Sequence, residues 1–277
     1  MAAAIAYLVQ YVMGRGMFKN MEYTKYGSLA IVCICIWNGM FNSIQAVCKE
    51  RDIIKREHRT GLHISSYLAA HMVFQSFICL LQVVISLAVF GVFGMNFPQE
   101  GLFTKFFLLD LGITMFLVTY ASDMLALMIS CIAHTGMTAM TIMPFILVVQ
   151  LVFAGGIFPL NRMGAKIIAQ YTVSNWGIRA VNTVSDVNGM KSILLTQAIV
   201  DMDAGGDEFI EKLQETLEED DELRIKLQYI IAGKMQDSAY AYTKENLVKC
   251  WGVLILFANI YVLIGLLFLE QIDRDKR

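Results

Sequence analysis

Charged residues and prolines are scarce in this chain. Only 17% of its 277 residues are charged and only 3 are proline, whereas 57% are hydrophobic. An ordinary globular domain has about 25% charged and about 45–50% apolar residues, so this composition excludes one such domain and favours a membrane protein. The net charge of -2 provides no bulk attraction to nucleic acid, and we expect no nucleic-acid partner.

Several catalytic and ligand-binding patterns are absent from the sequence. It has no GxxxxGK[ST] phosphate-binding loop and no HExxH or GxSxG pattern, so we expect no enzyme activity and no bound cofactor in this chain. The six cysteines form no CxxC pair and no His/Cys cluster, so we expect buried, reduced thiols and no metal site. They are Cys33, Cys35, Cys48, Cys79, Cys131 and Cys250.

Five apolar segments are long enough to cross a bilayer, which takes about 20 helical residues. They are 26–47, 64–93, 103–131, 137–158 and 247–269. The run 2–13 is apolar but too short to cross, and no basic residue precedes it as in a signal peptide, so it is predicted to be part of a first transmembrane helix. We therefore predict an all-α integral membrane protein with a bundle over 26–158 and a last span and tail over 247–277.

Basic residues are unevenly distributed between the connections. Segments 48–63, 132–136 and 270–277 share one side of the predicted bundle and hold Lys49, Arg51, Lys55, Arg56, Arg59, Arg274, Lys276 and Arg277. The opposite short connections hold Arg15, Lys19, Lys25 and Lys105. The positive-inside rule therefore predicts a plasma-membrane protein whose basic run and C-terminus lie in the cytosol.

The long segment 159–246 then lies outside the membrane, and its middle is acidic. Between Asp201 and Glu222 only Lys212 opposes the carboxylates, while apolar residues recur at helical spacing. This pattern predicts one or two amphipathic helices in an acidic external insert. Residues 201–212 resemble a calcium loop only in part, because Lys212 stands where a glutamate is required.

The run Cys48–Gly61 is dense in charge and lies between two predicted spans. As a helix over 49–59 it would turn Ile53 and Ile54 towards the membrane and its charges towards water. Such charge cannot lie in lipid, so the run is either a docking element for a soluble partner or only a cytosolic anchor. The residues alone leave both interpretations open.

Isolated polar residues lie within the predicted spans. Asp123 is either a group on a substrate or proton path, or a structural carboxyl bonded to a neighbouring helix. Asn38, Asn42 and Gln150 are the other candidates for a polar pathway.

Two motifs resemble those of a known family. The first is Phe41-Asn-Ser-Ile-Gln-Ala-Val-Cys-Lys-Glu-Arg-Asp-Ile-Ile-Lys-Arg-Glu57, followed by Tyr67-Leu-Ala-Ala. The second is Gln150-Leu-Val-Phe-Ala-Gly-Gly-Ile-Phe-Pro159, continuing to Tyr171-Thr-Val-Ser-Asn-Trp176. They resemble type-2 ATP-binding cassette (ABC) permeases, particularly G-subfamily (White-like) exporters and bacterial relatives with forkhead-associated domains.

The resemblance implies a six-helix permease bundle with its first helix truncated and a cytosolic coupling helix over 49–61. It also implies an external re-entrant turn within 159–246. The ATPase-coupling residues would be Glu50, Arg51, Lys55, Arg56 and Glu57, and the external turn would use Gly155, Gly156, Ser174 and Trp176. ATP and Mg would be bound by a partner ATPase, separate or fused, and a second permease copy would complete a homodimer in the lipid bilayer.

This resemblance predicts an ATP-driven exporter that moves a hydrophobic or amphipathic substrate by alternating access. Two alternatives stay open. One is a proton-coupled secondary transporter that uses Asp123, and the other is a membrane scaffold or sensor whose acidic external domain binds a ligand.

Overall fold

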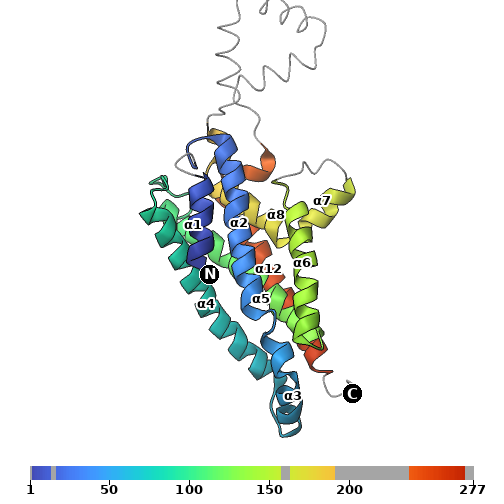
Figure 1. The fold of residues 1–277 in the computed structure, drawn as a ribbon. Coiled ribbons are helices and arrows are strands. Elements are labelled where there is room, and N and C mark those ends of the chain that lie inside the picture. Colours follow the sequence, from blue (N-terminus) through green and yellow to red (C-terminus); the bar gives the residue numbers. More distant parts are fainter. Residues whose placement is uncertain (1, 14–16, 157–162, 191–236, 272–277) are drawn as a thin grey trace, which may run out of the picture.

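The computed structural model describes residues 2–13, 17–156, 163–190 and 237–271 as a bundle of helices (Figure 1). The long helices are α2 (Met21–Ser43), α4 (Ile64–Val92), α5 (Phe107–Ile132) and α12 (Lys244–Leu269). The shorter ones are α1 (Ala2–Met13), α3 (Ala46–Arg59), α6 (Gly136–Val152), α7 (Met163–Gln170), α8 (Val173–Val184), η1 (Val187–Gly189) and η2 (Ser238–Tyr240).

Four stretches of helix are long and apolar enough to cross a membrane: α2 with its continuation α3, α4, α5 and α12. They confirm the all-α membrane fold and correspond to four of the five predicted spans. The other predicted span, 137–158, is α6, which has 17 residues and contains Pro144. At about 1.5 Å per residue it is about 25 Å long, short of the roughly 30 Å hydrocarbon core. The helix ends because the chain turns at Gly155, whose φ is 79°.

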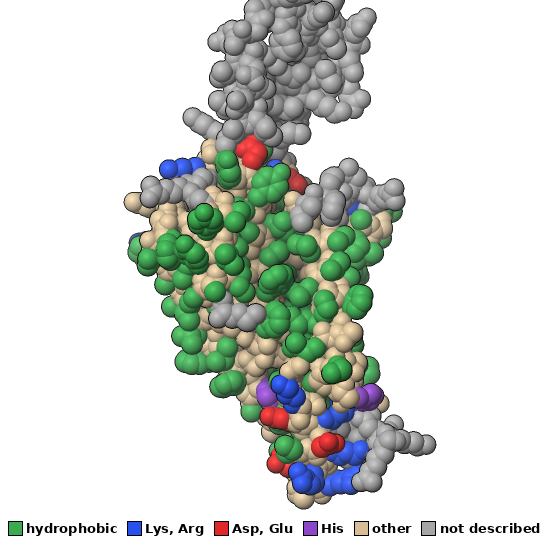
Figure 2. Space-filling model, viewed as in Figure 1, with side chains coloured by type: hydrophobic (Ala, Val, Ile, Leu, Met, Phe, Trp, Pro, Cys, Tyr) green, Lys and Arg blue, Asp and Glu red, His purple; other side chains and the backbone are tan. Residues whose placement is uncertain are grey.

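Helix α5 forms the centre of the bundle and packs against α2, α4, α8 and α12. In its most apolar stretch 72% of the residues are buried, against 28% in α4 and in α12. A helix that is apolar all round belongs in a core, whereas α4 and α12 keep apolar side chains on the outside, where lipid would cover them. Figure 2 shows hydrophobic side chains spread over the sides of the bundle.

Helices α2 and α5 approach closely at Gly39. A Cβ atom built on Gly39 would overlap the carbonyl oxygen of Thr119 and lie 2.8 Å from the amide nitrogen of Asp123. Small residues let the backbones of membrane helices come together in this way.

Helix α8 lies inside the bundle. All of its residues except Arg179 are buried, and it packs against α2, α5 and α12. The sequence predicted an external position for 159–246, with a re-entrant turn within it, and this position relative to the membrane stays a prediction. The structure shows that 173–184 pack between long helices of the bundle, because α8 has an apolar face to bury.

The two ends of the bundle are different. Helix α3 projects at one end, where α12 also ends, whereas η1 and η2 lie at the other end (Figure 1). There the Asn188 side-chain amide donates to the Asp237 carbonyl oxygen at 3.1 Å. The described residues on either side of 191–236 therefore lie close together. The acidic insert and the basic tail residues Arg274, Lys276 and Arg277 lie outside the described residues.

Asp110 organises the loop before α5. Its carboxylate is fully buried and accepts from the Phe103 amide at 2.8 Å and from the Thr104 amide at 3.0 Å. Asp110→Ala is expected to lower the free energy of unfolding by about 1–3 kcal/mol, because two amides lose their acceptor. Thermal unfolding in detergent would measure the loss. Glu100→Ala, an exposed carboxylate of the same loop, is the control, and equal melting of both variants would contradict this role.

Candidate functional site

The charged end of the bundle is built by α3. Charged side chains gather on this projecting helix, below the hydrophobic middle of the bundle (Figure 2). The predicted helix over 49–59 is confirmed and begins slightly earlier, at Ala46. Ile54 is 1% exposed and anchors the inner face, whereas Ile53 is 47% exposed, so the expectation that both face the membrane stays a prediction. Successive helical residues are about 100° apart, and the narrow inner face takes only one of them.

Glu50 joins α3 to α4. Its Oε2 accepts a hydrogen bond from the Tyr67 hydroxyl at 2.8 Å. Both residues belong to the quoted sequence motif, in which Tyr67 follows the charged run. The structure thus gives Glu50 a partner within the chain, on the helix that follows α3.

Arg51 joins α3 to α5. Its Nη1 donates to the carbonyl oxygens of Cys131 at 2.9 Å and Ala133 at 3.3 Å. These carbonyls belong to the end of α5, where backbone acceptors have no partner within the helix. Arg51 therefore points into the bundle.

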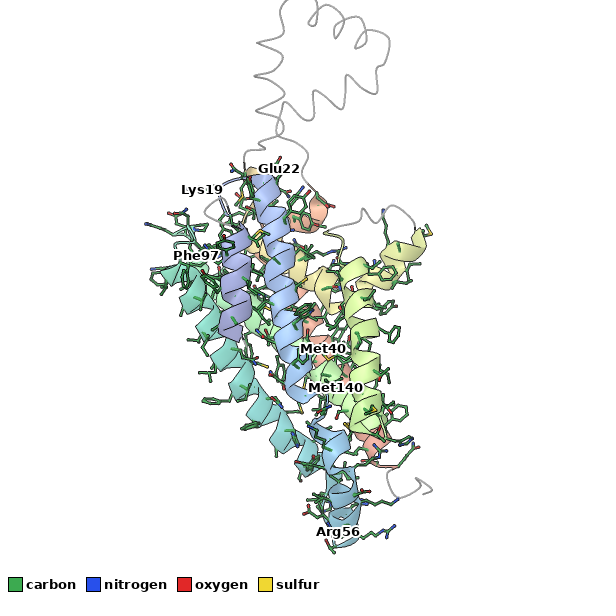
Figure 3. The ribbon with its side chains drawn as sticks, viewed as in Figure 1. Lys19, Glu22, Met40, Arg56, Phe97 and Met140 are labelled. Atoms are coloured by element: carbon green, nitrogen blue, oxygen red, sulfur yellow. The ribbon has the colours of Figure 1, made fainter. Side chains whose placement is uncertain are left out.

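The distal part of α3 carries the other predicted coupling residues. Arg56 and Glu57 are exposed, and Lys55 is half-buried. Figure 3 places Arg56 at the tip of α3, away from the other helices. The predicted set therefore divides into an inner pair, Glu50 and Arg51, which bond to α4 and α5, and the more distal residues, of which Arg56 and Glu57 are exposed.

A polar cluster connects α2, α4 and α5 above α3. Asn42 and Gln82 exchange two amide hydrogen bonds, at 3.0 and 2.8 Å. Asn42 Nδ2 also lies 3.8 Å from Cys79 Sγ, which donates to Asp123 Oδ2 at 3.4 Å. Asp123 is fully buried, and its Oδ1 has no hydrogen-bond partner among the residues that the structure describes. Asn42 and Asp123 thus belong to the same cluster. Polar side chains in a membrane bundle commonly form such hydrogen bonds between helices.

Gln150 belongs to a separate site, the joint between α6 and α8. Its Oε1 accepts from the Ser174 amide at 3.0 Å, and its carbonyl oxygen accepts from the Ser174 hydroxyl. The Ser174 amide is in the first turn of α8, where donors lack helical partners. Gln150 therefore holds the start of α8 against the end of α6.

The four residues predicted for the external turn meet at this joint. Gly155 adopts a positive φ, and a Cβ on Gly156 would lie 3.3 Å from side-chain atoms of Ile178 and Leu29. Trp176 donates from Nε1 to the Gln170 carbonyl oxygen at 2.8 Å. The Trp176 bond thus ties the end of α7 to α8, and the positive φ at Gly155 favours glycine at that position.

Two cavities border α2. One, of about 150 Å³, lies against α6 and α8 and has a largely apolar lining that includes Trp37, Leu147, Gln150 and Ser174. The other, of about 390 Å³, lies at the junction with α3 and is lined by Asn42, Gln45, Lys49, Glu50, Met140 and neighbouring residues. Asn38 is 6% exposed on α2, and neither cavity is lined by Asn38 or Asp123.

Sequence reasoning missed three residues in these contacts. Gln82 carried a signal, since it is one of two amides, with Gln75, in an apolar span. Cys79 was expected only to be a buried thiol. Ser130 of α5 carried no signal, because serine is common in membrane helices. Its hydroxyl oxygen accepts from the backbone amides of Val47 and Cys48, which are far away in sequence.

The six cysteines lie in helices of the bundle and form no disulfide. All six cysteines are free; five are buried and Cys33 is half-buried. Within residues 2–13, 17–156, 163–190 and 237–271, no three His, Cys, Asp or Glu side chains cluster in a way that could hold a metal ion.

Comparison with known proteins places this architecture in a family. The family model described as ABC-2 type transporter matches residues 1–184, from α1 through α8. The chain belongs to the ABC-2 type transporter family. Its membrane domain is a transport component and is not itself catalytic, and the chain is a multi-pass membrane protein.

One relative of this ABC-2 domain is an ABC transporter ATP-binding/permease protein of Mycobacterium tuberculosis. It is 27% identical over 154 residues, which are 55% of this chain and 18% of that protein. The chain therefore corresponds to a minor part of that relative's length. The assignment to the G-subfamily and to forkhead-associated relatives stays a prediction.

Proposed function

We propose that this ABC-2 domain is the permease of an ATP-driven exporter for a hydrophobic or amphipathic substrate. The observation that carries the proposal is the arrangement of α3. Its inner residues are bonded to α4 and α5, while its charged tip, with Arg56 and Glu57, projects beyond the bundle. A rigidly held, exposed and charged helix is suited to receive force from a soluble partner.

The proposed partner is an ABC ATPase that binds ATP and Mg, as a separate subunit or as another part of the same polypeptide. The Mycobacterium tuberculosis relative supports this, since its name combines ATP binding with permease activity. Docking of that ATPase on residues 49–61 would use Arg56, Glu57 and Lys55. Glu50 and Arg51 would hold the docking helix in place.

The proposed transport mechanism is alternating access between two permease copies. The cavity between α2, α6 and α8 has an apolar lining with one buried amide, Gln150, which suits a hydrophobic or amphipathic molecule. Exposed apolar side chains on α6, such as Phe145 and Val148, offer a face for a second copy or for lipid. Asn38, Asn42 and Asp123 are proposed as further polar groups of the pathway, outside the lining of this cavity.

The proposed orientation follows the distribution of basic residues. Lys49, Lys55, Arg56 and Arg59 belong to α3, so the positive-inside rule favours a plasma-membrane protein with α3 in the cytosol. Helix α12 ends on the same side as α3, so the C-terminus would also be cytosolic (Figure 1).

Affinity purification tests this function. The tagged protein would be extracted in mild detergent from its native membranes, its companions identified by mass spectrometry, and vanadate-sensitive ATP hydrolysis assayed. We expect an ABC ATPase, either as a co-purifying subunit or within the same polypeptide, together with ATP hydrolysis. A pure preparation with no nucleotide-binding protein and no hydrolysis would contradict the proposal.

A further inference from the structure

Helices α3 and α5 cap each other's ends. The first turn of α3 exposes amides with no acceptor inside the helix, and its N-cap residue, Gln45, makes no side-chain capping bond. Ser130 of α5 takes that role. Its Oγ accepts from the Val47 amide at 3.0 Å and from the Cys48 amide at 3.1 Å.

The return contact is made by Arg51. Its guanidinium group bonds to the Cys131 and Ala133 carbonyl oxygens at the end of α5. A cation at a helix C-terminus is also favoured by the helix dipole. Each helix therefore satisfies the terminal backbone groups of the other, through four hydrogen bonds within a few residues.

The Ser130 side of this reciprocal cap is protected from water, whereas Arg51 on the other side is half-buried. Ser130, Val47 and Cys131 are fully buried, and Cys48 is 7% exposed. Hydrogen bonds in such surroundings are costly to break, because the separated groups find no water to replace their partners.

The connection of α3 to α2 is less rigid than its connection to α5 through the reciprocal cap. The helix is interrupted at Ile44 and Gln45, where φ of Gln45 is -115° and ψ is 2°. A short break in a helix can act as a hinge, whereas the reciprocal cap fixes α3 to α5 at several points. Helix α5 in turn packs against α2, α8 and α12, at the centre of the bundle.

We infer that Ser130 and Arg51 are positioning residues that make α3 and the end of α5 move as one unit. Force applied to α3 then enters the bundle through α5. The inference rests on the proposed function for the source of the force, but the reciprocal cap itself can be tested without it.

The test uses the full protein with any associated ATPase, in lipid nanodiscs. Spin-labelled non-natural amino acids replace Ile53 on α3 and Ile132 at the end of α5, both of which have exposed side chains. Pulsed electron paramagnetic resonance measures their separation without nucleotide and after vanadate trapping with Mg-ATP. The variants are Ser130→Ala, Arg51→Gln and Ser130→Thr, which keeps the hydroxyl acceptor.

Ser122→Ala is the matched control. Ser122 is also a buried serine of α5, but its hydroxyl donates to the Val118 carbonyl oxygen of the same helix at 2.8 Å. We expect one narrow separation, unchanged by nucleotide, in the unmutated protein, in Ser122→Ala and in Ser130→Thr. In Ser130→Ala and Arg51→Gln the separation should broaden already without nucleotide, and in Ser130→Ala it should also shift on trapping.

Two results would overturn the inference. One is a separation that already changes on trapping in the unmutated protein, and the other is an unchanged, narrow separation in both Ser130→Ala and Arg51→Gln. If no ATP hydrolysis is found, the proposed function fails. The separation measured without nucleotide then still tests whether the reciprocal cap holds α3 to α5. A distribution broader in Ser130→Ala than in Ser122→Ala would support the reciprocal cap, and equal widths would refute it.

Discussion

Gly39→Ala is expected to destabilise the bundle by about 1–3 kcal/mol, the usual cost of overpacking a tight contact. The added Cβ would meet the Thr119 carbonyl oxygen and the Asp123 amide nitrogen. Both are backbone atoms of α5, so neither can rotate away as a flexible side chain would. Helix α2 must therefore shift, and this shift disturbs the packing at the centre of the bundle. Thermal unfolding in detergent, followed by size-exclusion chromatography, measures the effect.

Gly252→Ala provides the matched control for that substitution. Gly252 is also a helical glycine, on α12, but a Cβ there meets nothing within 4 Å. Alanine is a better helix former than glycine, so this variant should be at least as stable as the unmutated protein. Equal melting temperatures for Gly39→Ala and Gly252→Ala would contradict the close approach of α2 and α5.

Arg56→Glu is expected to lower the affinity of the protein for its ATPase about tenfold or more. Folding and membrane insertion should stay normal. Arg56 is exposed at the tip of α3, so its replacement disturbs no packing within the chain (Figure 3). Reversing a charge against a complementary surface costs at least about 1.4 kcal/mol, which is a factor of ten in affinity. The measurement is vanadate-sensitive ATP hydrolysis of the purified protein with its ATPase, together with the amount of ATPase retained.

Lys244→Glu serves as its control, because Lys244 is exposed at the start of α12, at the opposite end of the bundle from α3. It reverses an equal charge and should retain both the ATPase and the activity. Full retention of the ATPase and of hydrolysis by Arg56→Glu would show that the tip of α3 is not the docking surface.

The fold could be predicted where hydrophobic length decides the structure. The long apolar runs became α2, α4, α5 and α12, since a helix satisfies its own backbone groups in lipid. Composition could not place α8, because its burial depends on space left between α2, α5 and α12. Nor could it foresee that α6 would end at Val152, where a turn through Gly155 takes over.

The candidate site could be predicted where charge density decides exposure. The charged run marked α3, and its distal residues Arg56 and Glu57 are exposed as the motif implied. The sequence could not show that Glu50 and Arg51 differ in role from Arg56 and Glu57, because all four are charged residues of the same run. Their bonds to Tyr67 and to the end of α5 depend on tertiary contacts. Ser130 is harder still, because its partners are backbone amides.

The most direct measurement is photocrosslinking from Ile53 in intact cells. A photoreactive amino acid at this exposed position of α3 would be activated, and the crosslinked peptides identified by mass spectrometry. The same group at Val73, an exposed apolar position of α4, is the control. We predict crosslinks from position 53 to an ABC ATPase, which are absent from position 73 and are lost in Arg56→Glu. Efficient crosslinking from position 53 to other proteins or to lipid alone would contradict docking of an ATPase on α3.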